Sequence, residues 1–152
     1  MSEINLLCDT SGSMAEGGKR YILRNQIRAI DQYYRLLGKN VDIKLILWSN
    51  NPAVIDWSRG QDVPDGILDC NGISDMSALI KAIGSDNEGY FAVLSDCFWD
   101  SNTRKELSEW SRALRPNHFR IIKIGEDANP SIKGPNVYEG SELIAALEDW
   151  VD

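Results

Sequence analysis

The sequence is poor in the residues that usually carry nucleophilic or transition-metal chemistry. It contains one histidine, His118, and three cysteines, Cys8, Cys70 and Cys97, among 152 residues. The cysteines lack the spacing of a zinc site, and an odd number cannot close into a disulfide framework. These features predict a protein of a reducing compartment, in which Cys8 is a small core residue and His118 is neither catalytic nor a zinc ligand.

Long hydrophobic runs and positive charge are also scarce. No stretch approaches the ~20 apolar residues that cross a bilayer, and the N-terminal residues show no basic and apolar secretion signal. The 16 Lys and Arg are outnumbered by 23 Asp and Glu, which gives a formal net charge of -7. Such a charge repels nucleic acids and anionic membranes. We therefore expect a cytoplasmic protein with neither nucleic acid nor membrane among its partners.

What is present is typical of one globular domain, residues 1–152. Helical and strand-like patterns alternate along the chain, and the short link at 50–52 makes an antiparallel hairpin of the two strands around it. We expect strands at 3–8, 41–48, 53–57, 90–95, 119–124 and 136–138, at most a short strand at 67–68, and helices at 19–37, 75–83, from 103 onward and at 141–151. The pattern predicts an α/β fold: a doubly wound, mostly parallel central sheet with one antiparallel edge strand and helices on both faces.

Two expectations concern helix ends. Thr103 and Glu106 have the spacing of a capping box, which would start a helix at Thr103. In the last helix, the apolar residues are expected to face inward: Leu143, Ile144, Leu147 and Trp150.

Oxygen-bearing side chains gather where three predicted strands end. Asp9, Ser11 and Ser13 directly follow the first strand, Ser74 precedes a helix in a glycine-containing loop, and Asp96 ends the strand at 90–95. Loops at the carboxyl edge of an open α/β sheet lie together and form its binding site. Carboxylate and hydroxyl oxygens suit Mg²⁺ or another hard divalent cation. The sequence therefore predicts a metal site built from these five residues.

This pattern resembles the von Willebrand factor A domain family and its metal-ion-dependent adhesion site (MIDAS). The family motif is Asp-x-Ser-x-Ser after the first strand, a Thr in a Gly-x-Thr-Asp-type loop, and an Asp ending a later central strand. Asp9, Ser11 and Ser13 match its first part, Ser74 stands at the Thr position, and Asp96 matches the last part. The resemblance implies that these residues bind Mg²⁺ or Mn²⁺, and that a Glu or Asp carboxylate of a partner protein completes the ion's coordination.

The chain departs from the family pattern at two positions. Ser74 keeps the hydroxyl of the usual Thr but lacks the methyl group that restricts its rotamer. Cys97 stands where many members have Gly, so the loop after Asp96 is expected to follow a different path. The chain looks most like small intracellular bacterial members, which accompany AAA+ ATPases of the MoxR type or stress modules similar to the TerY group.

Three functions are compatible with these residues. The first is a non-enzymatic, metal-dependent protein-binding module that recruits or regulates a larger complex, such as an AAA+ ATPase or a stress-response system. The alternative is a metal-dependent hydrolase or phosphotransferase with Asp9 as nucleophile, and the third is a domain that binds no metal. Phe98 and Trp99 follow Asp96, and they either form an exposed partner-binding rim or lie buried under the loop.

Overall fold

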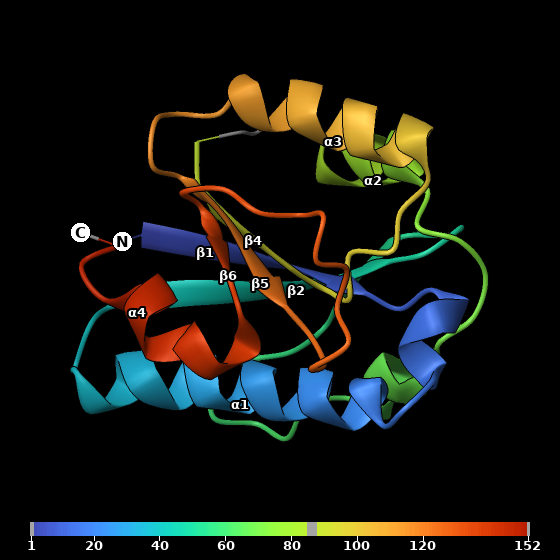
Figure 1. Ribbon diagram of the computed structural model, residues 1–152. Helices are drawn as coiled ribbons and strands as arrows, with labels where there is room; N and C mark the ends of the chain where they lie inside the picture. Colours follow the sequence, from blue (N-terminus) through green and yellow to red (C-terminus); the bar gives the residue numbers. More distant parts are fainter. Residues whose placement is uncertain (1, 85–87, 152) are drawn as a thin grey trace.

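The computed structural model describes residues 2–84 and 88–151. Within these residues, six strands form one sheet in the order β3-β2-β1-β4-β5-β6 (Figure 1). Every neighbouring pair is parallel except β2 and β3, which form the antiparallel edge hairpin. This confirms the predicted fold class. The strands are β1 Ser2–Asp9, β2 Val41–Trp48, β3 Ala53–Ile55, β4 Tyr90–Ser95, β5 Phe119–Lys123 and β6 Val137–Tyr138.

Helices cover both faces of the sheet. α1 (Lys19–Leu36) and α4 (Leu143–Leu147) lie below the sheet in Figure 1, and α2 (Met76–Ile83) and α3 (Ser101–Arg112) lie above it. Three short 3₁₀ turns, η1 (Gly12–Ala15), η2 (Asp65–Leu68) and η3 (Gly140–Glu142), complete the described elements. In the ranges the structure describes, no helix is long and apolar enough to span a bilayer.

The sheet separates two hydrophobic layers. Along β1, Leu6 and Cys8 belong to the hydrophobic layer between the sheet and helices α1 and α4. Leu7 belongs to the layer between the sheet and helices α2 and α3. This alternation follows from the two-residue period of a strand. Because β1 is buried on both faces, its sequence is apolar almost throughout, which is typical of the central strand of a parallel sheet.

The register of the central strands brings the predicted site loops together. Asp9 pairs with Trp48 of β2, and Cys8 pairs with Leu94 of β4. The carboxyl ends of β1, β2 and β4 are therefore level with one another. The loops that follow them emerge at one edge, as expected for a doubly wound sheet.

The structure differs from the prediction at residues 67–68 and at the start of α3. Residues 67–68 belong to η2, not to a strand, because the chain turns there to bury the single side chain of Ile67. The capping box is also wrong: α3 begins at Ser101, and the Asp100 carboxylate accepts a hydrogen bond from the Thr103 amide at 2.7 Å. Glu106 instead accepts a hydrogen bond from Ser77 on α2 at 2.7 Å.

The last helix is shorter than predicted. α4 ends at Leu147, and Asp149 has a positive φ of 56°. That turn directs Trp150 into the core, where its Nε1 donates to the Asn117 carbonyl at 2.7 Å. Ile144 is 57% exposed, which corrects the expectation that it faces inward. It lies on the solvent side of α4 because Leu143 and Leu147, four residues apart, occupy the sheet-facing side.

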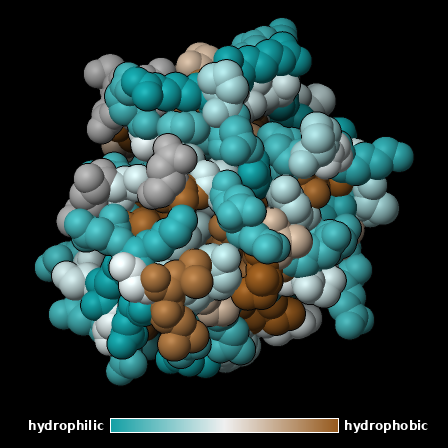
Figure 2. Space-filling model, turned by 90° about the vertical axis from the view of Figure 1, so that its left-hand side faces the viewer, coloured by the Kyte–Doolittle hydropathy of each residue, from teal (hydrophilic) through white to brown (hydrophobic). Residues whose placement is uncertain are grey.

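The end of the molecule that carries both termini shows scattered hydrophobic areas on a mainly hydrophilic surface (Figure 2). Leu36 and Leu37, where α1 ends, are exposed apolar side chains of this kind. His118 also lies at this end of the sheet, stacked on Tyr90 with 4.0 Å between ring centroids. It is therefore remote from the carboxyl edge that holds the predicted metal ligands.

Candidate metal centre

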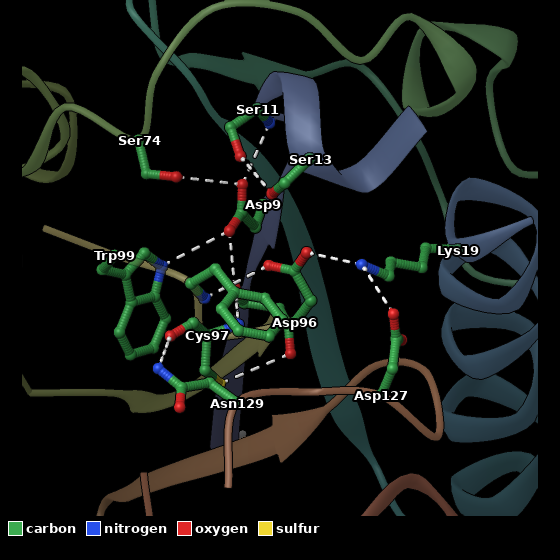
Figure 3. A network of polar contacts seen from close by, with 12 residues as sticks. Asp9, Ser11, Ser13, Lys19, Ser74, Asp96, Cys97, Trp99, Asp127 and Asn129 are labelled. Atoms are coloured by element: carbon green, nitrogen blue, oxygen red, sulfur yellow. Dashed lines mark hydrogen bonds and ion pairs between the residues drawn. The ribbon is translucent and has the colours of Figure 1, made fainter. Parts of the chain in front are cut away.

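Asp9 is the centre of a hydrogen-bond network at the end of β1 (Figure 3). Its side chain is buried, with the residue only 1% exposed. Oδ1 accepts hydrogen bonds from the Ser11 amide at 2.9 Å and the Ser74 hydroxyl at 3.1 Å. Oδ2 accepts from the Ser95 hydroxyl at 2.5 Å and from Nε1 of Trp99 at 3.3 Å. Donors from three loops and from β4 therefore hold this carboxylate in one orientation.

Burial is the main influence on the protonation of Asp9. It raises the pKa of this carboxyl group above its usual value, and the negative charge of Asp96 raises it further. The hydrogen bonds from Ser95 and Ser11 oppose this shift because they stabilise the ionised form. The net rise in the pKa of Asp9 therefore comes mainly from its burial, which the hydrogen bonds offset only in part.

The predicted serine ligands lie beside this carboxylate. The hydroxyls of Ser11 and Ser13 are 3.5 Å apart, and Ser74 reaches Asp9 from the loop before α2 (Figure 3). Ser11 and Ser13 are held in place by η1, whose Met14 side chain is fully buried. The structure thus places three hydroxyls around one buried carboxylate.

Backbone hydrogen bonds join the loops of the site. The Gly12 amide donates to the Gly72 carbonyl at 2.9 Å, and the Asn71 amide donates to the Thr10 carbonyl at 2.9 Å. The Thr10 amide donates to the Trp48 carbonyl at 3.0 Å. The loop after β1 is therefore joined both to the loop before α2 and to the end of β2.

Gly72 is required by its surroundings. It has a φ of +74°, and a Cβ atom at this position would lie 1.9 Å from Oδ1 of Asn50. That oxygen accepts a hydrogen bond from the Ile73 amide at 2.9 Å, so the Asn50 side chain is itself held in place. The glycine in the Gly-x-Ser-Asp loop therefore has a packing role as well as a conformational one.

Asp96 is paired with a lysine that the sequence analysis missed. Nζ of Lys19, the first residue of α1, lies 3.0 Å from Oδ2 of Asp96 and 3.6 Å from Oδ2 of Asp127. Lys19 is only 3% exposed. Burial by itself would lower the pKa of Lys19, but the hydrogen bond and charge of Asp96, together with Asp127, raise it overall. The lysine and Asp96 therefore form a buried ion pair.

A sequence signal for this pair exists in retrospect. A cation in the first turn of a helix opposes the helix dipole, so Lys19 at the start of a predicted helix calls for a compensating carboxylate. The identity of that carboxylate is set by the fold, because Asp96 is 77 positions away in the sequence.

Cys97 adopts a conformation typical of glycine. Its φ is 66°, and its amide donates to the Ser95 hydroxyl at 2.9 Å. Its side chain is buried in the hydrophobic layer between the sheet and helices α2 and α3. Because left-handed φ values are what glycine supplies at such turns, the exchange of Gly for Cys does not by itself require the different loop path that we expected.

Phe98 and Trp99 have different environments. Phe98 is 51% exposed, and its ring centroid lies 5.5 Å from Nζ of Lys19. Trp99 is 9% exposed and packs on Trp48, with 5.6 Å between ring centroids. Trp99 therefore forms part of the wall of the site and supports Asp9, which is the buried one of the two alternatives that the sequence left open. Phe98 does lie on the surface.

A hollow of about 260 Å³ opens above the serines. Phe98 and Ile73 line it, and both are more than half exposed. Asp100 also lines the hollow, although its carboxylate is used to cap α3. The full lining is Ser11, Ser13, Gly72, Ile73, Ser74, Phe98, Trp99, Asp100 and Thr103. The site therefore has hydroxyls at its floor and apolar side chains at its edge.

The donor set fits a hard divalent cation. It combines two carboxylates, Asp9 and Asp96, with three serine hydroxyls, and oxygen ligands of these types are preferred by Mg²⁺ and Mn²⁺. The described residues contain no cluster of three or more His, Cys, Asp or Glu side chains that could hold an ion. A metal at this edge of the sheet would therefore depend on the hydroxyls.

Taken together with the similar solved structures, the strand order and the helices on both faces show the fold of a von Willebrand factor A-like domain. The chain is similar to proximal thread matrix protein 1 from the mussel byssus, with a TM-score of 0.65 and 12% identity over 97% of this chain and 47% of that one. Manganese-loaded TRAP protein from Plasmodium vivax gives a TM-score of 0.61 and 15% identity over 99% and 73%. An aerotolerance-related membrane protein from Bacteroides fragilis, a variant with multiple mutations to serines, gives 0.59 and 10% over 98% of both chains.

These similarities establish the fold. The chain spans about half the length of the mussel protein, and one structure of that protein has a zinc-occupied MIDAS motif. No protein-family model matches the sequence, and no curated protein matches it significantly.

Proposed function

We propose that this domain is a divalent-metal-dependent protein-binding module. In this proposal, Mg²⁺ or Mn²⁺ at the Asp9 site accepts a Glu or Asp carboxylate from a partner protein. The observation that carries the proposal is the convergence of Ser11, Ser13 and Ser74 on the buried Asp9 carboxylate at the floor of an open hollow. Each of these residues belongs to the metal set that the sequence predicts.

Each ligand has a distinct role in this proposal. Ser11 and Ser13 bind the ion through their hydroxyls, and Ser74 binds it directly or through water. Asp9 and Asp96 either hold metal-bound waters or bind the ion themselves. When bound, the ion supplies an electrophilic position that a carboxylate can occupy. The protein orients the hydroxyls through Asp9 and keeps the opposite side of that carboxylate covered by Trp99.

The charge of the site favours an acidic ligand. The buried charges of the site are those of Asp9, Asp96 and Lys19, and they sum to -1 without an ion; Asp127, which also pairs with Lys19, is mostly exposed to solvent and is not counted. A divalent cation changes this sum to +1. Neutral hydroxyl ligands leave that charge available, and an incoming carboxylate would neutralise it. Phe98 and Ile73, exposed at the edge of the hollow, would contact apolar parts of the same partner.

The position of Asp9 supports binding over catalysis. A nucleophile or general base must reach the reacting atom of a substrate. Asp9 is 1% exposed, and both of its oxygens already accept hydrogen bonds from two donors each. This arrangement disfavours the hydrolase or phosphotransferase alternative. The resemblance to small intracellular members favours a partner within a larger complex, such as an AAA+ ATPase.

Calorimetric melting with and without metal tests the proposal. We expect excess MnCl₂ or MgCl₂ to stabilise the protein, by about 2.7 kcal/mol at a free-ion concentration near 100 Kd. For a domain of this size that is about 5–10 °C in Tm. Ser13→Ala should lose this shift, and its Tm in EDTA should stay close to that of the wild type because Ser13 adds little to the core.

The control for this test is Ser58→Ala, which removes an exposed hydroxyl outside the site and should keep the full metal shift. An equal shift in Ser13→Ala would contradict the proposed ligand set. Retention of a partner on immobilised protein in Mg²⁺, and its release by EDTA, would test the second half of the proposal.

A further inference from the structure

A basic groove runs along α3, outside the candidate metal centre. Two adjoining cavities of about 400 and 510 Å³ lie between α3 and the sheet edge formed by β5 and β6. Their linings have Ser111, Arg112, Phe119 and Asn136 in common, so they form one continuous depression. We call this depression the α3 groove. Its combined volume is within the range of sites that bind ligands.

The groove exists because a loop, not a helix, connects β5 to β6. Residues 124–136 cross the upper face of the sheet beside α3 (Figure 1). Asn129 anchors this loop: its amide donates to the Asp96 carbonyl at 2.9 Å, and its side chain donates to the Cys97 carbonyl at 3.1 Å. The far end of the loop is joined to β5 by the Ile121 amide, which donates to the Asn136 carbonyl at 2.9 Å. Because hydrogen bonds hold both ends of this loop, the shape of the depression is set by the fold.

The charge of the groove is opposite to that of the whole chain. Five of its 19 lining residues are Lys or Arg, and no Asp or Glu is among the described residues that line it. The chain as a whole has 16 basic and 23 acidic residues. An even distribution of charge would therefore place several carboxylates here. The basic residues are Arg104, Arg112, Arg115, Arg120 and Lys133.

Three of these cations form no ion pair within the described part of the chain. Arg115 is paired with Glu88, and Arg120 stacks on Tyr138 and Trp150. Arg104, Arg112 and Lys133 are exposed and take part in none of the ion pairs there. Arg104 and Arg112 are eight residues apart on α3, and both line the groove, as does Ser108, which lies between them in the sequence.

The floor between these cations is apolar. Leu107, Phe119 and Ile121 are buried at the base of the groove, and Ile132 and Val137 are half-buried along its side. A ligand that fills the groove would therefore need both negative charges and apolar side chains. Nucleic acid fits less well, because the aromatic residues of the lining, Trp99 and Phe119, are buried and offer no face for base stacking.

We propose that the α3 groove binds an acidic peptide segment with interspersed apolar side chains, supplied by a partner protein. Asp or Glu residues of the peptide pair with Arg104, Arg112 and Lys133, and its apolar side chains pack on Ile132 and Val137. Because the groove lies beside α3 and its cations do not touch the metal ligands, this binding requires no metal ion. Among the described residues, the linings of the groove and of the hollow at the Asp9 site share the buried Trp99, and the proposal does not rest on the proposed function of that site.

The experiment is fluorescence anisotropy with a labelled 12-residue peptide of four Asp-Leu-Glu repeats, measured in EDTA. We expect saturable binding, and a matched peptide with Asn and Gln in place of Asp and Glu should bind at least about tenfold more weakly. Arg112→Glu and Arg104→Glu should each weaken binding of the acidic peptide by about tenfold, which is ~1.4 kcal/mol. Lys105→Glu is the matched control, since Lys105 is an exposed cation on the same helix outside the groove.

The melting temperature of each variant shows whether its fold is intact. Equal affinities for the acidic and neutral peptides, or an equal loss in Lys105→Glu, would overturn the proposal. So would the absence of binding by the wild type, or tighter binding of a single-stranded oligonucleotide of the same charge. Loss of metal binding in Ser13→Ala with unchanged peptide binding would support two separate sites.

Discussion

Lys19 has a double effect on the Asp9 site. Its ammonium group compensates the charge of Asp96 when no ion is present, and it repels a cation that binds nearby. A buried ion pair is costly to break from one side only, because the remaining charge loses its partner. Under the proposed function, we therefore expect the same residue to stabilise the metal-free domain and to keep the affinity for the ion modest. Modest affinity suits a site that needs an additional ligand from a partner.

The first prediction concerns Lys19→Gln. We expect Mn²⁺ to bind about tenfold more tightly by titration calorimetry, because the competing positive charge is removed. In EDTA the variant should unfold at lower temperature, with a loss of about 3–5 kcal/mol for a buried carboxylate without its partner. Lys44→Gln, at the exposed ion pair with Glu3, should change neither quantity. Unchanged Mn²⁺ affinity in Lys19→Gln would show that Lys19 does not act on the ion.

The second prediction concerns the thiols. Burial raises the pKa of Cys97 to about 12 and that of Cys70 to about 11, and it raises the pKa of Cys8 well above its ordinary value. Since the thiolate is the reactive form, iodoacetamide at pH 8 should modify the native protein slowly. Cys70, the half-buried one, should react first, and all three should react in guanidinium. Mass spectrometry of digested samples checks this order, and fast native labelling of Cys97 would contradict it.

At the scale of elements, the site depends on how its loops are joined. Each parallel strand ends at the same edge, but the orientation of Asp9 comes from donors in three loops and in β4. The loop before α2 is constrained because Gly72 has a positive φ and is packed against Asn50. Changes in that loop should therefore affect the position of Ser74.

The third prediction compares two glycines with positive φ. Gly17→Ala should cost about 1 kcal/mol, since a Cβ there would meet no atom within 4 Å and only the backbone conformation is unfavourable. Gly72→Ala should cost clearly more, because its Cβ would overlap Oδ1 of Asn50. Chemical denaturation measures both.

A double variant isolates the cause of this difference. With Asn50→Ala in place, the penalty of Gly72→Ala should fall to about that of Gly17→Ala, because the overlapping oxygen is gone. A penalty at Gly72 that does not depend on Asn50 would rule out the steric explanation.

At the scale of the whole molecule, the two proposed sites differ in charge and in dependence on metal. The metal site lies at the carboxyl edge of the central strands, and the α3 groove lies on one face beside β5 and β6. Both would recruit acidic ligands to a chain with a net charge of -7. Long-range repulsion should therefore oppose both interactions at low ionic strength, while the local cations favour them.

The sequence by itself determined the α/β class, the edge hairpin and which residues the fold brings together at the candidate metal site. It could do so because strand and helix periods are local, and because parallel strands must place their following loops at one edge. Short elements were less predictable: the chain turns at 67–68 where Ile67 is buried and after Leu147 where Trp150 is buried, and periodicity reveals neither turn.

Only the tertiary structure decided which side chains surround the predicted ligands. The pairing of Lys19 with Asp96 spans 77 positions, and the hydrogen bond from Trp99 to Asp9 spans 90. The groove along α3 likewise needs a helix and a loop that meet only in the folded sheet. Such contacts are set by how layers pack across long sequence separations, so no local pattern in the chain encodes them.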